Sequence, residues 1–354
     1  MNLRFAGKRI SSLVAVVPKN ERLFDDEVGY FNFAKANSMK LKQVMGFKKH
    51  RLAEDGVCAS DLCLRGLEYL FEQGALRRDE IDALLFVSQS PDHFIPPTSN
   101  IIQGRAGLGT DVLCMDINQG CAGFVVGLIQ AFTLLNLPEI RKVVLLNGDT
   151  LSKKVSRRDR NIYPMIGDAG SVTVVERDPA EETVWATINM DGSRSRSLEI
   201  PAGGFRMPSS PETAVEELVD ENNYRSRDQF HMDGPAVFNF VQTTVPPMID
   251  ALLGLAGASR ESVDYFLFHQ PNKFMLQKLA DKMKVPREKM PGNVVEEFGN
   301  ASSVTIPTNI AFNLGDRLHD HVYTVCLAGF GVGLTWTSML MNLGNLSLCR
   351  LIEV

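Results

Sequence analysis

The chain has 354 residues, of which 44% are hydrophobic and 22% are charged, a composition that is typical of globular proteins and argues against disorder, collagen and coiled coils. A chain of this length buries roughly three quarters of its unfolded surface, so it needs no disulfide or metal to fold. The formal net charge of −5 argues against nucleic acid as a main partner.

The longest apolar stretch, residues 124–137, is interrupted by polar residues and falls short of the ~20 residues that cross a bilayer. Near the N-terminus, an apolar run is broken at Ser11 and Ser12 and stops at Pro18, which indicates a first strand rather than a signal peptide. The six cysteines form no CxxC pair and have no zinc spacing. We therefore expect a cytoplasmic protein with no membrane span and no bound metal.

Short runs rich in Val, Leu and Ile alternate with longer helical patterns, which is typical of an α/β fold with buried strands. The predicted strands cover residues 10–17, 83–87, 112–117, 143–147, 171–176, 183–191, 265–268, 323–328 and 332–341. The predicted helices include residues 59–73, 122–135, 236–253 and 273–283. A polar, Pro- and Gly-containing stretch, residues 193–233, is predicted to be a long excursion between two halves.

An internal repeat supports this division. DALLFVSQSPD, QGCAGF and KVVLLNGD follow one another in the first half, and VDYFLFHQPNK, FGNASS and VYTVCLAGFG do so in the second. The separation from Phe86 to Cys121 is 35 residues, and that from Phe268 to Asn300 is 32. We predict two pseudo-symmetric halves, residues 1–192 and 234–354, joined by the excursion 193–233.

Three residues of the repeat are candidates for chemistry. Cys121, between glycines at the expected start of an apolar helix, is placed where the helix dipole would lower the pKa of its thiol; it is equally compatible with a small buried core residue. His269 follows a predicted strand and is either a functional or a satisfied core histidine. Asn300 fits a site residue or a helix N-cap. Strand ends of α/β sheets gather ligands, so all three could meet in one pocket.

Other motifs exclude some functions. Residues 329–336, GFGVGLTW, suggest a backbone that passes close to a ligand and offers N–H groups to an oxyanion. Neither GxGxxG opening a helix nor GxxxxGK[ST] is present, which argues against nucleotide-dependent chemistry. His319 and His321 lack a further ligand in a metal-binding spacing.

In their order and separations, the strings DINQGCAGF, IGDAGSVTVVE, FHQPNKFML, FGNASSVTIP and GFGVGLTW resemble the β-ketoacyl-ACP synthase III family of the thiolase superfamily. The resemblance spans about residues 81–341. It implies a five-layered αβαβα thiolase-like fold made of two similar halves, and a homodimer.

The resemblance also implies an activity in fatty-acid or related acyl-chain biosynthesis. Cys121 would take an acyl group from an acyl-CoA or acyl-ACP, and His269 and Asn300 would hold malonyl-ACP while it loses CO2 and condenses with that acyl group. The N–H groups of Cys121 and Gly331 would form the oxyanion hole. No cofactor or metal is implied, and acyl carrier protein is the expected partner.

Further residues match binding positions of the family. By that match Asn272 would contact the pantetheine arm, Gly234 and Phe238 would line the tunnel, and Arg160 would lie beside the nucleotide of coenzyme A. The basic stretch that ends in Lys282 and Lys284 lies near the expected carrier docking site; the other reading is a solvated helix face.

The sequence departs from relatives that use acetyl-CoA in residues 39–47, MKLKQVMGF, which lack the Trp and Arg that hold adenine there. This departure favours an acyl-ACP donor, or another thioester. In the loop that often places an aromatic at the end of the acyl pocket the chain has Ile95, which suggests a longer or branched primer. The alternative function is a thiolase-fold acyltransferase of a specialised pathway, such as surface-polysaccharide or secondary-metabolite assembly, that moves an acyl group to an amine or alcohol.

Overall fold

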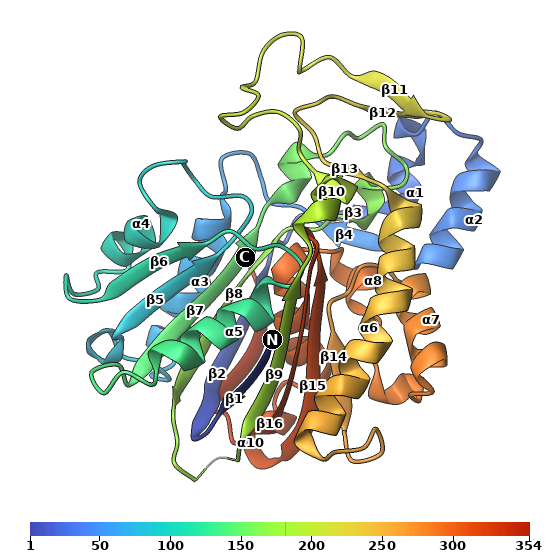
Figure 1. Ribbon diagram of the computed structural model, residues 1–354. Coiled ribbons are helices and arrows are strands. Elements are labelled where there is room, and N and C mark those ends of the chain that lie inside the picture. The colour runs from blue at the N-terminus through green and yellow to red at the C-terminus, as the bar shows by residue number, and fades with distance from the viewer. Residues whose placement is uncertain (181) are drawn as a thin grey trace.

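The computed structural model describes residues 1–180 and 182–354 and contains two large mixed sheets (Figure 1). The first has six strands in the order β17-β2-β8-β7-β5-β6 and the second has five in the order β1-β9-β16-β15-β14. The strands of the first sheet are β2 (Lys8–Val17), β5 (Ala83–Val87), β6 (Leu113–Ile117), β7 (Lys142–Asp149), β8 (Ala169–Arg177) and β17 (Leu348–Glu353). Those of the second are β1 (Asn2–Phe5), β9 (Val184–Met190), β14 (Tyr265–Phe268), β15 (Val322–Gly331) and β16 (Thr335–Gly344).

The two sheets share one pairing pattern. In the first, β5 pairs parallel with β7, β7 antiparallel with β8, and β8 antiparallel with β2. In the second, β14 pairs parallel with β15, β15 antiparallel with β16, and β16 antiparallel with β9. The predicted repeat is thus present in the topology. Each sheet also contains a strand from the other predicted half, since β9 lies in the second sheet and β17 in the first. The division at residues 192 and 233 therefore stays a prediction.

Helices form three layers around these sheets. The main ones are α3 (Ala59–Glu72), α4 (Thr98–Arg105), α5 (Gly123–Leu134), α6 (Gly234–Ala256), α7 (Lys273–Met283) and α9 (Thr305–Asn313). The outer layers are α3 with α4 on the first sheet and α6 with α7 on the second. Helices α5 and α9 are packed between the sheets, which gives the predicted αβαβα order (Figure 1).

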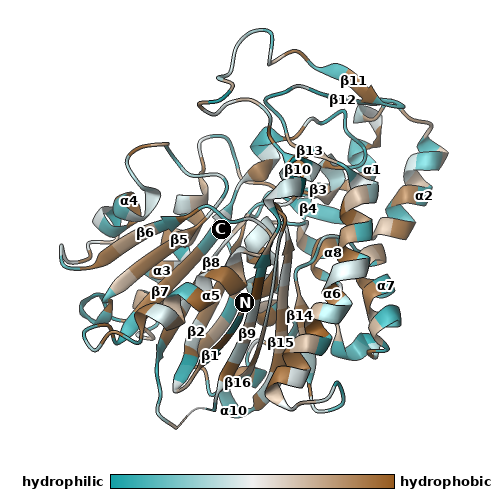
Figure 2. Cartoon of the chain, viewed as in Figure 1, coloured by the Kyte–Doolittle hydropathy of each residue, from teal (hydrophilic) through white to brown (hydrophobic). Residues whose placement is uncertain are grey.

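Burial on both faces explains the sequence of the strands. Strand β5 is ALLFV and is buried at all five positions, because α3 and α5 cover opposite faces of its sheet. The strands of both sheets are accordingly coloured mostly hydrophobic in Figure 2. Helix α5 is apolar almost throughout, as expected of a helix that contacts sheets on two sides.

The excursion carries four short strands: β10 (Leu198–Glu199), the hairpin of β11 (Glu217–Asp220) with β12 (Asn223–Arg225), and β13 (His231–Met232), which pairs with β10. It folds back onto the first half through several contacts. Among them, the buried side chains of Arg225 and Asp159 form an ion pair, the Ser156 hydroxyl donates to Glu216 at 2.7 Å, and the Phe230 N–H donates to the Lys154 carbonyl at 2.7 Å. These contacts therefore hold the excursion over the ends of the sheets.

No residue range was predicted for α2 (Lys35–Met45), α4, α9, β1 or β17. Helix α2 is mostly polar, and β17 pairs parallel with β2 at the end of the chain. The remaining short elements are α1 (Phe24–Glu27), α8 (Val294–Phe298), α10 (Arg317–Asp320), β3 (Glu21–Leu23) and β4 (Lys49–Arg51), together with 3-10 turns such as η7 (Ser302–Val304). Among residues 1–180 and 182–354, no helix combines the length and apolar character needed to cross a bilayer. The homodimer and the cytoplasmic location stay predictions.

The turn before α5 is held against β15 by a close backbone approach. A Cβ on Gly329 would lie 2.6 Å from Ala122 Cα and 3.0 Å from the Cys121 carbonyl oxygen. Only glycine allows this approach, so the position of Cys121 depends on it.

We predict that Gly329→Ala lowers the free energy of unfolding by about 1–3 kcal/mol, because backbone atoms have to move to accept the methyl group. The measurement is urea denaturation. The matched control is Gly254→Ala in α6, where a Cβ meets nothing within 4 Å, and which should stabilise the protein by about 0.5–1 kcal/mol. Equal effects of the two substitutions would contradict the close approach.

Candidate active site

A cavity of about 660 Å³ lies where the ends of the two sheets meet the excursion. It is lined mainly by apolar side chains from α2, α6, α7 and the excursion, with Cys121, His269 and Asn300 among the polar ones. The three predicted residues therefore reach one space, although they come from different elements.

Cys121 lies between β6 and α5, and its partly exposed side chain lines the cavity. Burial, and then the carboxyl group of Asp149, raises the pKa of the thiol to about 11. The Val332 N–H, the Ser302 hydroxyl and the N–H of Cys121 itself lower the pKa by less. Desolvation is thus the largest influence on the thiol pKa. That the helix terminus lowers this pKa stays a prediction.

Gly331 ends β15 directly beside the thiol. A Cβ built on Gly331, whose φ is +159°, would lie 2.8 Å from Cys121 Cβ and 2.9 Å from its Sγ. Glycine is thus the residue that lets this backbone lie against the nucleophile. The arrangement is compatible with the predicted oxyanion hole.

His269 follows β14 and is 2% exposed, with its ring edge-on to that of Phe330 at 5.7 Å between centroids. Its Nδ1 lies 2.7 Å from Thr305 Oγ1, which also accepts the Gln270 N–H and donates to the Ser302 carbonyl at 3.0 Å. Burial lowers the pKa of His269 to about 3. The imidazole is therefore neutral at physiological pH and carries one proton.

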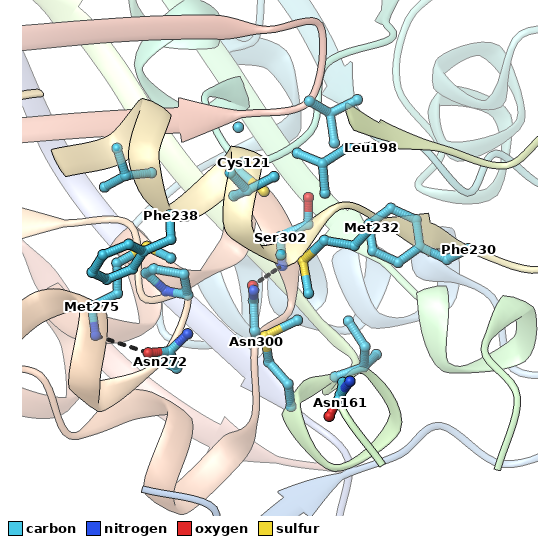
Figure 3. A pocket seen from close by; sticks show the side chains of 18 of the residues that line it. Cys121, Asn161, Leu198, Phe230, Met232, Phe238, Asn272, Met275, Asn300 and Ser302 are labelled. Carbon is cyan, nitrogen blue, oxygen red and sulfur yellow. Dashed lines mark hydrogen bonds between the residues drawn. The ribbon is translucent and has the colours of Figure 1, made fainter. Parts of the chain in front are cut away.

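Asn300 lies between α8 and η7, at the start of the segment that leads into α9. Its backbone N–H donates to the Met165 carbonyl at 2.7 Å, and its carbonyl accepts from the Gly167 N–H at 3.2 Å. Its side-chain oxygen accepts the Ser302 N–H at 2.9 Å, as Figure 3 shows. Asn300 is nevertheless not a helix N-cap, because Ala301 and Val304 are the N-caps of η7 and α9. The residue lines the cavity.

Among the predicted binding residues, Asn272, Gly234 and Phe238 all line the cavity. Asn272 caps α7 by accepting the Met275 N–H at 2.9 Å (Figure 3). The Phe238 ring is stacked on that of Phe274, with 5.7 Å between centroids. These residues form one side of the cavity, together with Phe274.

The chain is similar in sequence to known proteins. Residues 115–192 match the family model "3-Oxoacyl-[acyl-carrier-protein (ACP)] synthase III", and residues 253–343 match the model of its C-terminal part. A β-ketoacyl-[acyl-carrier-protein] synthase III of Streptococcus mutans is 30% identical over 300 residues, which are 84% of this chain and 88% of the relative. The chain belongs to the β-ketoacyl-ACP synthase III family.

Solved structures of similar proteins have the same fold as this chain. A 3-oxoacyl-(acyl-carrier protein) synthase of Burkholderia xenovorans LB400 is 34% identical, with a TM-score of 0.92 over 100% of this chain and 99% of the other. The priming β-ketosynthase of the R1128 polyketide pathway is 19% identical, with a TM-score of 0.78 over 96% and 97% of the two chains, which shows a common fold alone. This β-ketoacyl-ACP synthase III family member is thus an acyltransferase-class condensing enzyme with the thiolase-like fold.

Arg160 is placed differently from the other predicted residues. It does not line the cavity, although its neighbour Asn161 does. Its guanidinium carbon lies 3.4 Å from the centre of the Phe33 ring, and its backbone N–H donates to Asn223 Oδ1 at 2.9 Å. One face of this guanidinium is therefore covered by the chain's own aromatic ring rather than open for adenine.

Three further polar residues at this family member's site were not singled out from the sequence. Thr305 contacts the imidazole of His269, and Ser302 and Asp149 both influence the Cys121 thiol. Asp149 ends β7 at the position that Gly331 occupies at the end of β15, which the repeat KVVLLNGD against VYTVCLAGFG could have indicated. No group of three or more His, Cys, Asp or Glu side chains in the described part of the chain is arranged to hold a metal ion.

We predict that Gly331→Ala slows alkylation of Cys121 by iodoacetamide roughly tenfold or more, since a contact of 2.9 Å between the new methyl group and Sγ displaces the thiol. The rate is followed by mass spectrometry of the Cys121 peptide. Gly234→Ala is the control, because a Cβ there meets nothing within 4 Å. An unchanged rate in the Gly331 variant would show that the backbone does not lie against the thiol.

Proposed function

We propose that the protein catalyses a decarboxylating Claisen condensation of an acyl thioester with malonyl-ACP, through an S-acyl intermediate on Cys121. The observation that carries this proposal is the convergence of a thiol, a neutral imidazole and a carboxamide on one largely apolar cavity. The family of the chain supports the same reaction class.

In the first half-reaction the Cys121 sulfur attacks the carbonyl of the acyl donor, whose thiol leaves. The N–H groups of Cys121 and Gly331 stabilise the negative oxygen of the tetrahedral intermediate. In the second half-reaction malonyl-ACP loses CO2, and the enolate that remains attacks the acyl carbon and releases the Cys121 sulfur. The products are a 3-oxoacyl-ACP and CO2.

The enolate oxygen needs donors of hydrogen bonds, and the site offers two. Asn300 uses its Oδ1 on the Ser302 N–H, so its Nδ2 is left for the substrate. His269 donates from Nε2 once the Thr305 hydroxyl turns from the Ser302 carbonyl, to which it donates at 3.0 Å in this structure, and donates to Nδ1 instead. Neutral donors in a dry site stabilise a developing charge strongly because they do not have to reorganise.

We further propose that the donor is an acyl-ACP. Helix α2 presents Leu41, Val44 and Met45 to the cavity, in the segment that lacks the adenine-binding Trp and Arg. Arg160 is stacked on Phe33. This apolar lining fits an acyl chain and the pantetheine arm better than it fits a nucleotide.

Exposed lysines lie on α2 and α7, two helices that also line the cavity. Lys40 on α2 and Lys278, Lys282 and Lys284 at α7 are exposed, and within residues 1–180 and 182–354 none of them forms an ion pair. The two helices contact each other. They would present a positive surface to an acidic carrier protein.

We predict that Cys121→Ala abolishes acylation, whereas His269→Ala and Asn300→Ala retain acylation and lower condensation by 10²-fold or more, because the enolate forms only in the second step. Intact-mass measurement with a panel of acyl-ACP and acyl-CoA donors reports acylation, and release of CO2 from malonyl-ACP with formation of a 3-oxo product reports condensation. Absence of Cys121 acylation with every donor would refute the proposed function. Acylation without a 3-oxo product would support transfer to an amine or alcohol instead.

We also predict that Lys40→Glu with Lys278→Glu raises KM for acyl-ACP about tenfold and leaves kcat nearly unchanged, because docking is weakened and chemistry is not. Steady-state kinetics at low salt measures this split. Arg141→Glu is the control: Arg141 is 75% exposed and precedes β7, at the opposite end of that strand from Asp149. The same KM for all variants would contradict carrier docking at α2 and α7.

A further inference from the structure

A buried polar group, formed by Glu27, His50 and Tyr163, takes no part in the reaction described so far. Glu27 ends α1, His50 is in β4, and Tyr163 begins the 3-10 turn η4 (Tyr163–Met165). The three residues are 3%, 1% and 3% exposed, in that order. They lie in a largely apolar region, since Tyr163 packs in a cluster with the side chains of α1 and of the segments that flank β4. Burial of such polar groups is unfavourable unless they are bonded to one another.

One carboxyl group connects the other two side chains. Glu27 Oε2 lies 3.0 Å from His50 Nε2, and Glu27 Oε1 accepts the Tyr163 hydroxyl at 3.1 Å. The Nδ1 of His50 lies 2.5 Å from the Ile166 carbonyl oxygen. Because a carbonyl only accepts hydrogen bonds, Nδ1 carries a proton and donates it. Both nitrogens of the ring and both oxygens of the carboxyl group therefore have a partner.

Ile166 is also the residue that pairs with Asn300. The two form an isolated parallel bridge, in which the Asn300 N–H donates to the Met165 carbonyl and the Asn300 carbonyl accepts the Gly167 N–H. In a parallel pair of this kind the carbonyl of the central residue, Ile166, points away from Asn300. That carbonyl is bonded to His50 instead. His50 and Asn300 therefore hold the same short segment from opposite sides.

His50 also lies directly against the residue that precedes Asn300. A Cβ on Gly299, whose φ is +79°, would lie 2.9 Å from His50 Cβ and 2.8 Å from Gly167 Cα. The left-handed backbone and this close approach both require glycine. Strand β4 contacts α8, which ends just before Gly299 (Figure 1). A displacement of His50 would therefore reach Asn300 through two contacts.

The hydrogen bonds of this group select one position of the segment that pairs with Asn300. Hydrogen bonds are directional, and a buried polar group that loses its partner is left unsatisfied at a large cost in free energy. Ile166 is 4% exposed, so its carbonyl cannot exchange His50 for bulk water. Glu27 restrains the same segment at its other end, through Tyr163.

We propose that His50 is a positioning residue for Asn300. Its Nδ1–H bond fixes the Ile166 carbonyl, and the bridge then fixes the backbone of the carboxamide that donates to the enolate oxygen. Glu27 holds the imidazole at its other nitrogen. This inference rests on the proposed condensation, because it names what orients one of the donors of the second half-reaction.

The proposal has a selective consequence. Cys121 is positioned by the turn before α5 and lies against Gly331 of β15, which are other elements than those that hold Asn300. Loss of the His50 bond should therefore slow condensation and leave acylation of Cys121 almost unchanged. A general loss of stability would not separate the two half-reactions.

Two substitutions of His50 test which of its bonds is needed. In His50→Asn the side-chain amide places an N–H group where Nδ1–H was and keeps a donor for the Ile166 carbonyl. In His50→Gln the longer amide reaches toward Glu27, in the place of Nε2, and leaves that carbonyl without a donor. We expect His50→Gln to lower condensation roughly tenfold or more, because a small displacement of an oriented group has a large effect on rate, and His50→Asn to stay within about threefold of the native rate.

Intact-mass measurement with the panel of acyl-ACP and acyl-CoA donors reports acylation, and CO2 release from malonyl-ACP reports condensation. Thr187→Val is the matched control, because it removes a buried hydrogen bond of the second sheet, between Thr187 Oγ1 and Ser338 Oγ at 2.7 Å. It should change both half-reactions by the same factor. Equal losses of acylation and condensation in His50→Gln would overturn the proposal, as would equal condensation rates in the two His50 variants.

Hydrogen exchange gives a second measurement, which needs no substrate. The amides of Gly167 and Asn300 form the bridge, so peptides that contain them should exchange roughly tenfold faster in His50→Gln and at the native rate in His50→Asn. If the native enzyme is never acylated, the proposed function fails, and this exchange pattern still decides whether His50 holds the bridge. If the native enzyme condenses its substrates but exchange is the same in all variants, the proposed function stands and the positioning role fails.

Thermal unfolding curves show whether each variant is folded. If the His50 variants do not fold, Tyr163→Phe decides, since it removes the hydroxyl bonded to Glu27 and keeps the ring that lies edge-on to the imidazole, with 5.3 Å between centroids. It should lower condensation about threefold or more without slowing acylation. Loss of neither half-reaction, or an equal loss of both, would overturn the proposal.

Discussion

The burial of α5 and α9 between two sheets is the constraint on which the rest of the structure depends. Each helix contacts apolar strands on both sides, so it cannot tilt or slide without opening the core. Cys121 immediately precedes α5, and Asn300 lies shortly before α9. Fixing the two helices therefore fixes the distance between the nucleophile and the carboxamide, which lie 179 residues apart in the chain. The close approach of Gly329 to the backbone of Cys121 and Ala122 shows that this tight packing reaches the site.

The same packing sets the electrostatics of the site. Because the groups are desolvated, the thiol holds its proton and the imidazole is neutral at physiological pH. A resting site without net charge in an apolar cavity suits a reaction whose intermediate is an enolate, since neutral donors bind the enolate oxygen without also protonating its carbon. The cost is that the nucleophile cannot ionise alone.

Many of the strands and helices were predictable because local sequence patterns indicate them. The strands at residues 83–87 and 265–268 and the helix at 273–283 have the predicted bounds, since short buried apolar runs and one amphipathic helix are flanked by polar residues. Helix α2 was not predicted because its sequence, KANSMKLKQVM, is mostly polar and its apolar face is short, with Leu41, Val44 and Met45 toward its C-terminal end. Strand β17 was missed because its partner β2 lies at the other end of the chain.

The site could be predicted as far as residue type and repeat position define it. Cys121, His269 and Asn300 follow from the repeat and the motifs, and they reach one cavity. The stacking of Arg160 on Phe33 depends on how two distant segments meet, which no local pattern contains. The left-handed backbone at Ser302 is likewise invisible in the string GNASSV, where any residue but glycine predicts an ordinary φ.

Duplication explains why the two half-reactions can use different residues within one cavity. Equivalent places in the repeat hold a thiol in one half and a carboxamide in the other, and equivalent strand ends hold Asp149 in one half and Gly331 in the other. At each pair, one copy carries a reactive or titratable group, and the other carries a neutral group or a bare backbone N–H. A symmetric pair of thiols or of carboxyl groups would repel or compete for the same substrate atom. The divergence of the two halves therefore separates the nucleophile from the carboxamide, while the shared packing brings both to one cavity.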